Sequence, residues 1–193
     1  MNNFSSGSYW SDRSDLLYYR YVDYMIRTIG RDASSLLDVG SGNCPYLEWF
    51  DWIPGRYSID LEKPYQSEDV VGIKGNIFDV QLTMHFDVLT CLQVLEHVPD
   101  AGSFAQRLLQ MANTLVVSVP YKWPKGKDKD HVHDPVDETK LEKWFGRKPN
   151  YSIVVREPFL WVCHERIICI YDSDPEKKYG VSDRFERIMR IAQ

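Results

Sequence analysis

The chain has 193 residues, 44% of them hydrophobic and 26% charged, which are the proportions of one ordinary globular domain with a buried core. Its 28 acidic and 23 basic residues give a net charge of −5, which argues against broad binding to nucleic acid or to anionic membranes. Without an apolar run of roughly 20 residues, a signal-peptide pattern or a C-x-x-C pair, we expect a cytoplasmic protein with no membrane partner.

The first predicted element is a helix within an N-terminal cap segment, residues 1–30. Apolar residues at mixed spacings of three and four predict that this helix runs from Asp12 to Ile29 and that Gly30 ends it. Short apolar runs then alternate with helical or loop segments. Such continuous runs are typical of buried parallel strands. We predict five of them, at Ser35–Val39, Arg56–Asp60, Val70–Lys74, Phe86–Cys91 and Thr114–Val119.

Further along, helical patterns occupy Ser103–Met111 and Glu138–Trp144. Ser152–Arg156 and Arg166–Tyr171 predict an antiparallel pair that closes the sheet. The alternation predicts a single doubly wound α/β domain over residues 1–193, with a catalytic core at 35–171 and a C-terminal helix at 182–193. The apolar face of that last helix would serve a homodimer or dock onto the sheet; it consists of Phe185, Ile188, Met189 and Ile191.

The most informative stretch is L-L-D-V-G-S-G-N, residues 36–43, a strand that ends in a turn. Gly40 and Gly42 bracket Ser41, and glycine permits the close backbone approach that a bound ligand requires. Ligands of doubly wound sheets bind outside the carboxyl ends of the strands, which is where this turn lies. The acid before the glycines, Asp38, repels phosphate and attracts an ammonium group.

Two neighbouring strand ends carry suitable partners for the same ligand. Asp60 follows the turn by about 20 residues, the place from which an acid accepts hydrogen bonds from ribose hydroxyls. Asn76 and Ile77, in G-N-I-F-D, can present an amide and a backbone N–H to a base edge. Pro45 occupies the third position of the dinucleotide pattern G-x-G-x-x-G and removes a donor, and there is no P-loop. We therefore expect a nucleoside without phosphates that has an amino-acid-like end.

With these segments in order, the chain resembles the class I S-adenosylmethionine-dependent methyltransferases. The matching segments are L-L-D-V-G-S-G-N, Y-S-I-D, G-N-I-F-D, F-D-V-L-T-C-L-Q-V-L-E-H-V and L-V-V-S-V-P. The resemblance implies a Rossmann-like seven-stranded sheet with strand order 3-2-1-4-5-7-6 and S-adenosylmethionine as cofactor. It implies that the cofactor-binding residues are Asp38, Gly40, Ser41, Gly42, Asp60, Leu61, Asn76, Ile77, Cys91 and Gln93.

This chain departs from the family pattern in two connections. Leu61–Asp69 and Val80–His85 are too short and polar for full crossover helices. We therefore expect a trimmed member of the fold whose adenine side is more open.

A second group of residues bears on the methyl acceptor. Gln93, Glu96 and His97 have the spacing of one face of a helical turn, and His131 and His133 follow the fifth strand on the ligand side. They predict either a divalent-metal site of Glu96, His97 and His131 or a general base among the catalytic candidates His97, His131 and His133.

The pattern is similar to that of small-RNA 2′-O-methyltransferases and ubiquinone-pathway O-methyltransferases, which carry E-x-x-E-H after the fourth strand. Gln93 replaces the first glutamate, and neutral amides are poor zinc ligands. V-L-E-H-V also occurs in metal-free methyltransferases, where it shapes the pocket. Metal binding therefore stays open.

Aromatic residues are candidates for the acceptor pocket. Tyr121 and Trp123 follow the fifth strand, and Trp123 between Lys122 and Pro124 suits stacking on a sugar or a planar group. Trp10, Tyr18 and Trp144 are further candidates, with core packing favoured for the last two. The one basic stretch, residues 122–129, is interpreted as a solvated loop.

The resemblance leads to an O-methyltransferase for a hydroxyl of a small molecule or glycan. The alternatives are an RNA 2′-O-methyltransferase with a metal site and a catalytically degenerate S-adenosylmethionine-binding protein. The net acidic charge disfavours a nucleic-acid partner.

Overall fold

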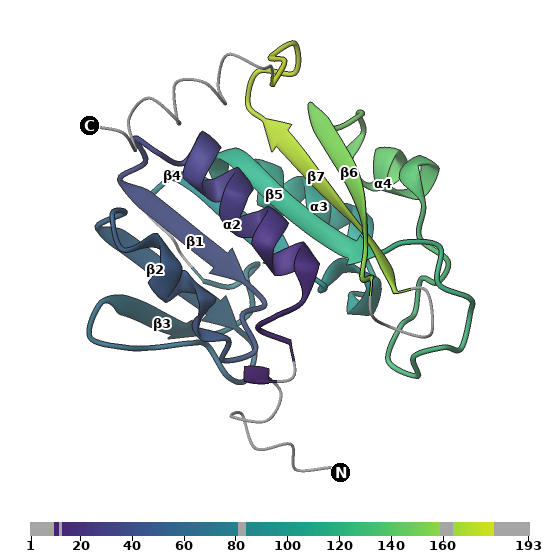
Figure 1. Ribbon diagram of the computed structural model, residues 1–193, viewed down its shortest axis with the longest axis horizontal. Coiled ribbons are helices and arrows are strands. Elements are labelled where there is room, and N and C mark those ends of the chain that lie inside the picture. The colour runs from purple at the N-terminus through teal and green to yellow at the C-terminus, as the bar shows by residue number, and fades with distance from the viewer. Residues whose placement is uncertain (1–9, 12, 81–83, 159–163, 180–193) are drawn as a thin grey trace.

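The computed structural model describes residues 10–11, 13–80, 84–158 and 164–179. Its centre is a seven-stranded sheet with helices on both faces (Figure 1), in the order β3-β2-β1-β4-β5-β7-β6. The predicted doubly wound sheet and its strand order are therefore confirmed. The strands are β1 Ser35–Val39, β2 Gly55–Asp60, β3 Val70–Lys74, β4 Phe86–Leu92, β5 Ala112–Pro120, β6 Tyr151–Arg156 and β7 Glu165–Asp172.

The strand directions bring every predicted functional loop to one edge. Strands β1 to β5 pair in parallel, so their carboxyl ends meet at the same edge of the sheet. β7 enters between β5 and β6 and pairs antiparallel with both. Its first residues, near Arg166, pair with Pro120 at the end of β5. The amino end of β7 therefore lies at the functional edge.

Helices bury the two faces of the sheet in separate cores. α2 (Leu17–Ile29) and the 3₁₀ helix η1 (Pro45–Phe50) cover one face, and Figure 1 shows α2 running along the strands. α3 (Ala101–Leu109) and α4 (Glu138–Phe145) cover the other, where Phe104 and Phe145 join the buried cluster. Continuous apolar strands are required because both faces of the sheet centre are covered.

The predicted start of the first helix is wrong. Asp12 lies outside the described residues, and residues 13–15 form a turn in which the Ser14 N–H donates to the Trp10 carbonyl at 2.8 Å. α2 begins at Leu17 because the N–H groups of Leu17 and Tyr18 donate to the two carboxylate oxygens of Glu157, at 2.8 and 3.2 Å. An acid after β6 thus caps a helix far away in the sequence.

The connections around β3 are short, as the sequence predicts. The described parts of the β2–β3 and β3–β4 connections contain no helix. That side of the carboxyl edge is therefore left open to a ligand. The predicted C-terminal helix at 182–193 and its apolar face lie outside the described residues. Among the described residues, no helix is long and apolar enough to cross a membrane.

Replacing Glu157 with alanine should destabilise the protein, because two N–H groups at the start of α2 lose their acceptor. We expect a loss of about 1–2 kcal/mol in the free energy of unfolding, measured by urea denaturation. Asp15→Ala is the control, since this side chain is 91% exposed and pairs with Arg20 at the surface. Equal losses in the two variants would contradict the capping role.

Candidate active site

Two cavities meet over the turn between β1 and η1, at the carboxyl edge of the sheet. The inner cavity, of about 230 Å³, surrounds Asp38 and extends to Gln93. The outer cavity, of about 800 Å³, lies over the ends of β2 and β3 and reaches Asp60 and Asn76. Gly40 and Gly42 line both cavities. A ligand that occupies both must therefore pass over the glycine turn.

The turn requires glycine at Gly40 for two reasons. Its φ is +81°, and a Cβ there would lie 2.4 Å from a methyl carbon of Val94. Gly42 also has a positive φ, of +53°, but faces open space. Its N–H donates to Asp60 Oδ2 at 3.0 Å, which ties the turn to the end of β2.

Asp38 is buried with half of its carboxylate satisfied. Its Oδ1 accepts hydrogen bonds from the hydroxyls of Tyr46 and Thr90, the latter at 2.7 Å. Its Oδ2 is buried and has no hydrogen-bond partner among the described residues. Burial raises the pKa of Asp38 to about 6, and the two hydroxyls offset part of this effect. The inner cavity thus contains a carboxylate oxygen that suits a cationic donor.

Asp60 is placed as the sequence predicts. Its Oδ1 accepts from the N–H groups of Glu62 and Lys63, at 2.8 and 2.9 Å, and these bonds hold the carboxylate at the wall of the outer cavity. Among the described residues, Oδ2 accepts only from the Gly42 N–H, so its second lone pair can accept from a ligand hydroxyl. The predicted residues Leu61, Asn76 and Ile77 line the same cavity.

Cys91, one of the predicted cofactor-binding residues, is not among the residues that line the two cavities. Its side chain is fully buried inside β4, in the core under α3. The next two residues, Leu92 and Gln93, line the inner cavity instead. Sequence reasoning missed other lining residues. They include Tyr19, Cys44 and Tyr46 in the inner cavity, Lys63 in both, and Val94 and Phe104 in the outer one.

Glu96, His97 and His131 come together beside the outer cavity. One potential ligand atom from each lies within 4.8 Å of the others. Glu96 and His97 belong to the 3₁₀ helix η2 (Leu95–His97) after β4, and His131 belongs to the loop after β5. The Val132 N–H donates to the Glu96 carbonyl at 2.9 Å and ties this loop to η2. His97 itself lines the outer cavity.

The arrangement suits a bound divalent cation. Glu96 is 1% exposed, and neither of its side-chain oxygens has a hydrogen-bond partner among the described residues. Burial raises its pKa to about 8. His131 Nδ1 lies 2.8 Å from Asp134 Oδ2, and His97 Nδ1 lies 3.0 Å from the Asp130 carbonyl. Contacts of this kind at one ring nitrogen fix the tautomer and leave the other for a metal.

Gln93 and His133 do not join this group. Gln93 precedes η2 with a φ of +58°, and its amide bridges Ser118 Oγ at 3.1 Å and Arg166 Nε at 3.2 Å. The expected shared helical face of Gln93 with Glu96 and His97 is therefore wrong. His133 Nε2 lies 2.8 Å from the Val98 carbonyl, and its ring packs against Trp144. Its contacts hold the loop to the segment after η2.

Of the two aromatic residues predicted to contact the acceptor, Tyr121 and Trp123, only Trp123 lies beside His131. The Tyr121 hydroxyl donates to Glu138 on α4 at 2.7 Å, which directs this side chain to α4. The Trp123 ring centroid lies 5.7 Å from that of His131. Trp123 therefore stands next to the histidine cluster. Tyr18 and Trp144 are buried, in agreement with core packing, although Tyr18 also lines the inner cavity.

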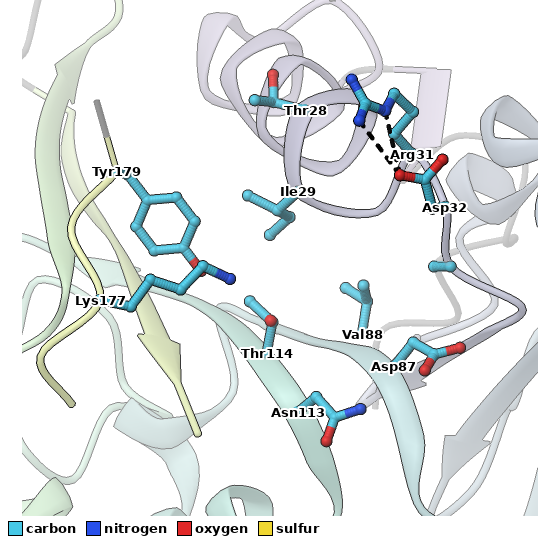
Figure 2. A pocket seen from close by; sticks show the side chains of 11 residues that line it. Thr28, Ile29, Arg31, Asp32, Asp87, Val88, Asn113, Thr114, Lys177 and Tyr179 are labelled. Carbon is cyan, nitrogen blue, oxygen red and sulfur yellow. Dashed lines mark hydrogen bonds and ion pairs between the residues drawn. The ribbon is translucent and has the colours of Figure 1, made fainter. Parts of the chain in front are cut away.

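Figure 2 shows another cavity, of about 340 Å³, at the amino ends of β4 and β5. Its charged side chains are engaged within the protein. Arg31 pairs with Asp32 at 3.2 Å, and Lys177 pairs with Asp172 at 2.7 Å. Asp87 accepts from the backbone and hydroxyl groups of Ser34 and Ser35. The cavities at the opposite, carboxyl edge are therefore the candidate active site.

Solved structures similar to this chain include two bacterial N-methyltransferases. One is the 1,6-didemethyltoxoflavin-N1-methyltransferase of Burkholderia thailandensis, with 19% identity, a TM-score of 0.62, and coverage of 86% of this chain and 84% of that chain. The other is NodS of Bradyrhizobium japonicum, with 13% identity, a TM-score of 0.61, and coverage of 83% and 89%. The chain has the class I methyltransferase fold. Both similar structures contain S-adenosylhomocysteine.

The small RNA methyltransferase HEN1 is another solved structure that is similar to this chain. Identity is 18%, the TM-score is 0.55, and the match covers 84% of this chain and 26% of that protein. Comparisons with protein-family models and with curated proteins gave no match.

Gly40→Ala should destabilise the protein more than Gly126→Ala. Both glycines have a φ of +81°, so both variants strain the backbone, at a cost of about 1–2 kcal/mol. Only the Cβ at position 40 meets another residue, Val94, since nothing lies within 4 Å of the Cβ at position 126. We expect an additional loss of about 1–3 kcal/mol for Gly40→Ala in urea denaturation. Equal losses would show that Val94 does not confine the turn.

Proposed function

We propose that this protein is an S-adenosylmethionine-dependent O-methyltransferase that acts on a hydroxyl of a small molecule or glycan with the help of a divalent cation. One observation supports both the O-methylation and the cation. The buried carboxylate of Glu96, which has no hydrogen-bond partner in the described part of the chain, lies with His97 and His131 beside the outer cavity. Three protein ligands with open positions are typical of catalytic rather than structural metal sites.

The two cavities fit the two ends of the methyl donor. Asp38 Oδ2 in the inner cavity suits the ammonium of the methionine part. In the outer cavity, Asp60 suits the ribose hydroxyls, and Asn76 and Ile77 suit the adenine. The S-adenosylhomocysteine in the similar structures of the 1,6-didemethyltoxoflavin-N1-methyltransferase and of NodS supports this proposal.

Methyl transfer to a hydroxyl has two requirements, alignment of the acceptor and removal of its proton. The acceptor oxygen must align with the methyl carbon as the C–O bond forms and the C–S bond breaks, and the hydroxyl must lose its proton. Glu96, His97 and His131 would hold the cation, which when bound lowers the pKa of a coordinated hydroxyl. Asp134 and the Asp130 carbonyl orient the two imidazoles for this role.

Binding of S-adenosylhomocysteine should weaken as the pH falls through about 6, because protonated Asp38 no longer attracts the ligand ammonium. We expect Kd to rise by about tenfold between about pH 7 and about pH 5, measured by calorimetry. The pKa of Asp38 is raised on folding, so its protonation stabilises the folded state and acid unfolding at this residue does not explain the loss. Asp38→Asn should bind weakly with no such pH dependence; an unchanged dependence would contradict the assignment.

Glu96→Gln and His131→Ala should abolish high-affinity binding of Mn²⁺ or Zn²⁺ and lower kcat by about a hundredfold or more, because the cation loses a ligand. Affinity for S-adenosylhomocysteine should stay within about twofold of wild type. His85→Ala is the control, since His85 is an exposed histidine bonded to Asn113. Calorimetry with each ion and with S-adenosylhomocysteine measures both bindings. S-adenosylhomocysteine binding without ion binding or turnover would favour a degenerate S-adenosylmethionine-binding protein.

A second candidate is metal-dependent 2′-O-methylation of RNA. The gathering of Glu96, His97 and His131 favours it, together with the similarity to the small RNA methyltransferase HEN1. The net charge of −5 argues against it. Methyl transfer to a short single-stranded RNA, with a Kd that depends steeply on salt, would select this candidate over a small-molecule or glycan acceptor.

A further inference from the structure

A buried arginine lies between the inner cavity and the cluster of His97 and His131. Arg166, at the amino end of β7, is 9% exposed. Its guanidinium carbon lies 4.8 Å from the ring centroid of Tyr18, which lines the inner cavity, and 5.8 Å from that of Trp123. Because Trp123 in turn packs beside His131, Arg166 lies between a residue of the inner cavity and the proposed metal ligands.

The charge of Arg166 is incompletely matched by the protein. Nε donates to the neutral amide of Gln93, and Nη1 lies 3.5 Å from the His164 carbonyl and 3.8 Å from Glu157 Oε1. The carboxylate of Glu157 also accepts the two N–H groups at the start of α2. In the part of the chain that the structure describes, Nη2 has no hydrogen-bond partner. A buried guanidinium with spare donors is a binding group for an oxyanion.

A second charged side chain lies on the same side, beside a histidine. Lys127 Nζ lies 4.3 Å from the ring centroid of Trp123, and the His164 ring packs against the same indole at 5.1 Å. The pKa of His164 is lowered by burial and by the charges of Lys127 and Arg166. A chain with a net charge of −5 thus concentrates positive charge around one aromatic residue beside the proposed metal ligands. Residues 122–129, which the sequence analysis interprets as a solvated loop, contribute Lys127 to this group.

We propose that Arg166, assisted by Lys127, binds an anionic group of the acceptor, a carboxylate or a phosphate ester near the hydroxyl that is methylated. This inference rests on the proposed function and narrows its acceptor to acidic hydroxyl compounds such as uronic acids or sugar phosphates. The planar guanidinium can donate two parallel hydrogen bonds to either group. The Trp123 ring can pack against the sugar ring.

The test uses protein loaded with S-adenosylhomocysteine and matched probes: glucuronate, glucose 1-phosphate and neutral glucose. We expect calorimetry to give at least about tenfold tighter binding for one of the acids than for glucose. Arg166→Gln should abolish this preference, and Arg166→Lys should retain part of it because the charge remains. Arg31→Gln is the matched control, since it removes the same charge at the cavity of the opposite edge (Figure 2) and should leave the preference unchanged. The two acids distinguish a carboxylate from a phosphate acceptor.

Three results would overturn the proposal. The first is equal binding of acids and glucose to the wild type; the second is an unchanged preference in Arg166→Gln. The third is a folded Arg166→Gln that no longer binds S-adenosylhomocysteine, which would assign Arg166 to the cofactor carboxylate. If that variant does not fold, competition decides: inorganic phosphate should displace the acid from the wild type without displacing S-adenosylhomocysteine, and failure to compete would refute the role. A wild type that binds no S-adenosylhomocysteine would refute the proposed function itself.

Discussion

The buried carboxylate of Asp38 is the constraint on which the site depends. One oxygen is held by the hydroxyls of Tyr46 and Thr90, so the first strand, η1 and β4 share a single polar contact beneath the glycine turn. The other oxygen has no partner among the described residues. Burying an incompletely satisfied acid is unfavourable, and the raised pKa of Asp38 expresses that cost. Such an arrangement is expected where a ligand completes the hydrogen bonding.

The turn above Asp38 could be predicted from its glycines. Gly40 must tolerate both a positive φ and the approach of Val94, and both demands appear as glycine in the sequence. Asp60 could be predicted for a similar reason, since the parallel register places the end of β2 beside the end of β1. Most of the cofactor-binding residues that the family resemblance implies line the two cavities.

Residues whose positions depend on tertiary contacts could not be predicted in this way. The start of α2 is determined by Glu157, which lies 140 residues from Leu17. Gln93 leaves the expected helical face because its amide bridges β5 and β7 through Ser118 and Arg166. His133 and His131 are two residues apart in one loop, yet a carbonyl holds one ring and a carboxylate the other. Spacing alone does not distinguish them.

The opposite charges at the two ends of the site explain how donor and acceptor would be oriented. Asp38 offers a negative group in the inner cavity, and Arg166 offers a positive one beyond Tyr18 and Gln93. A zwitterionic donor would place its ammonium on Asp38 and its nucleoside over Asp60. An anionic acceptor is attracted to Arg166 and repelled by Asp38, whereas the donor ammonium is attracted to Asp38. Arg166 also favours the ionised form of Glu96, which opposes the effect of burial on that carboxylate. Arg166 can therefore act both in acceptor recognition and in keeping the proposed metal ligand Glu96 ionised.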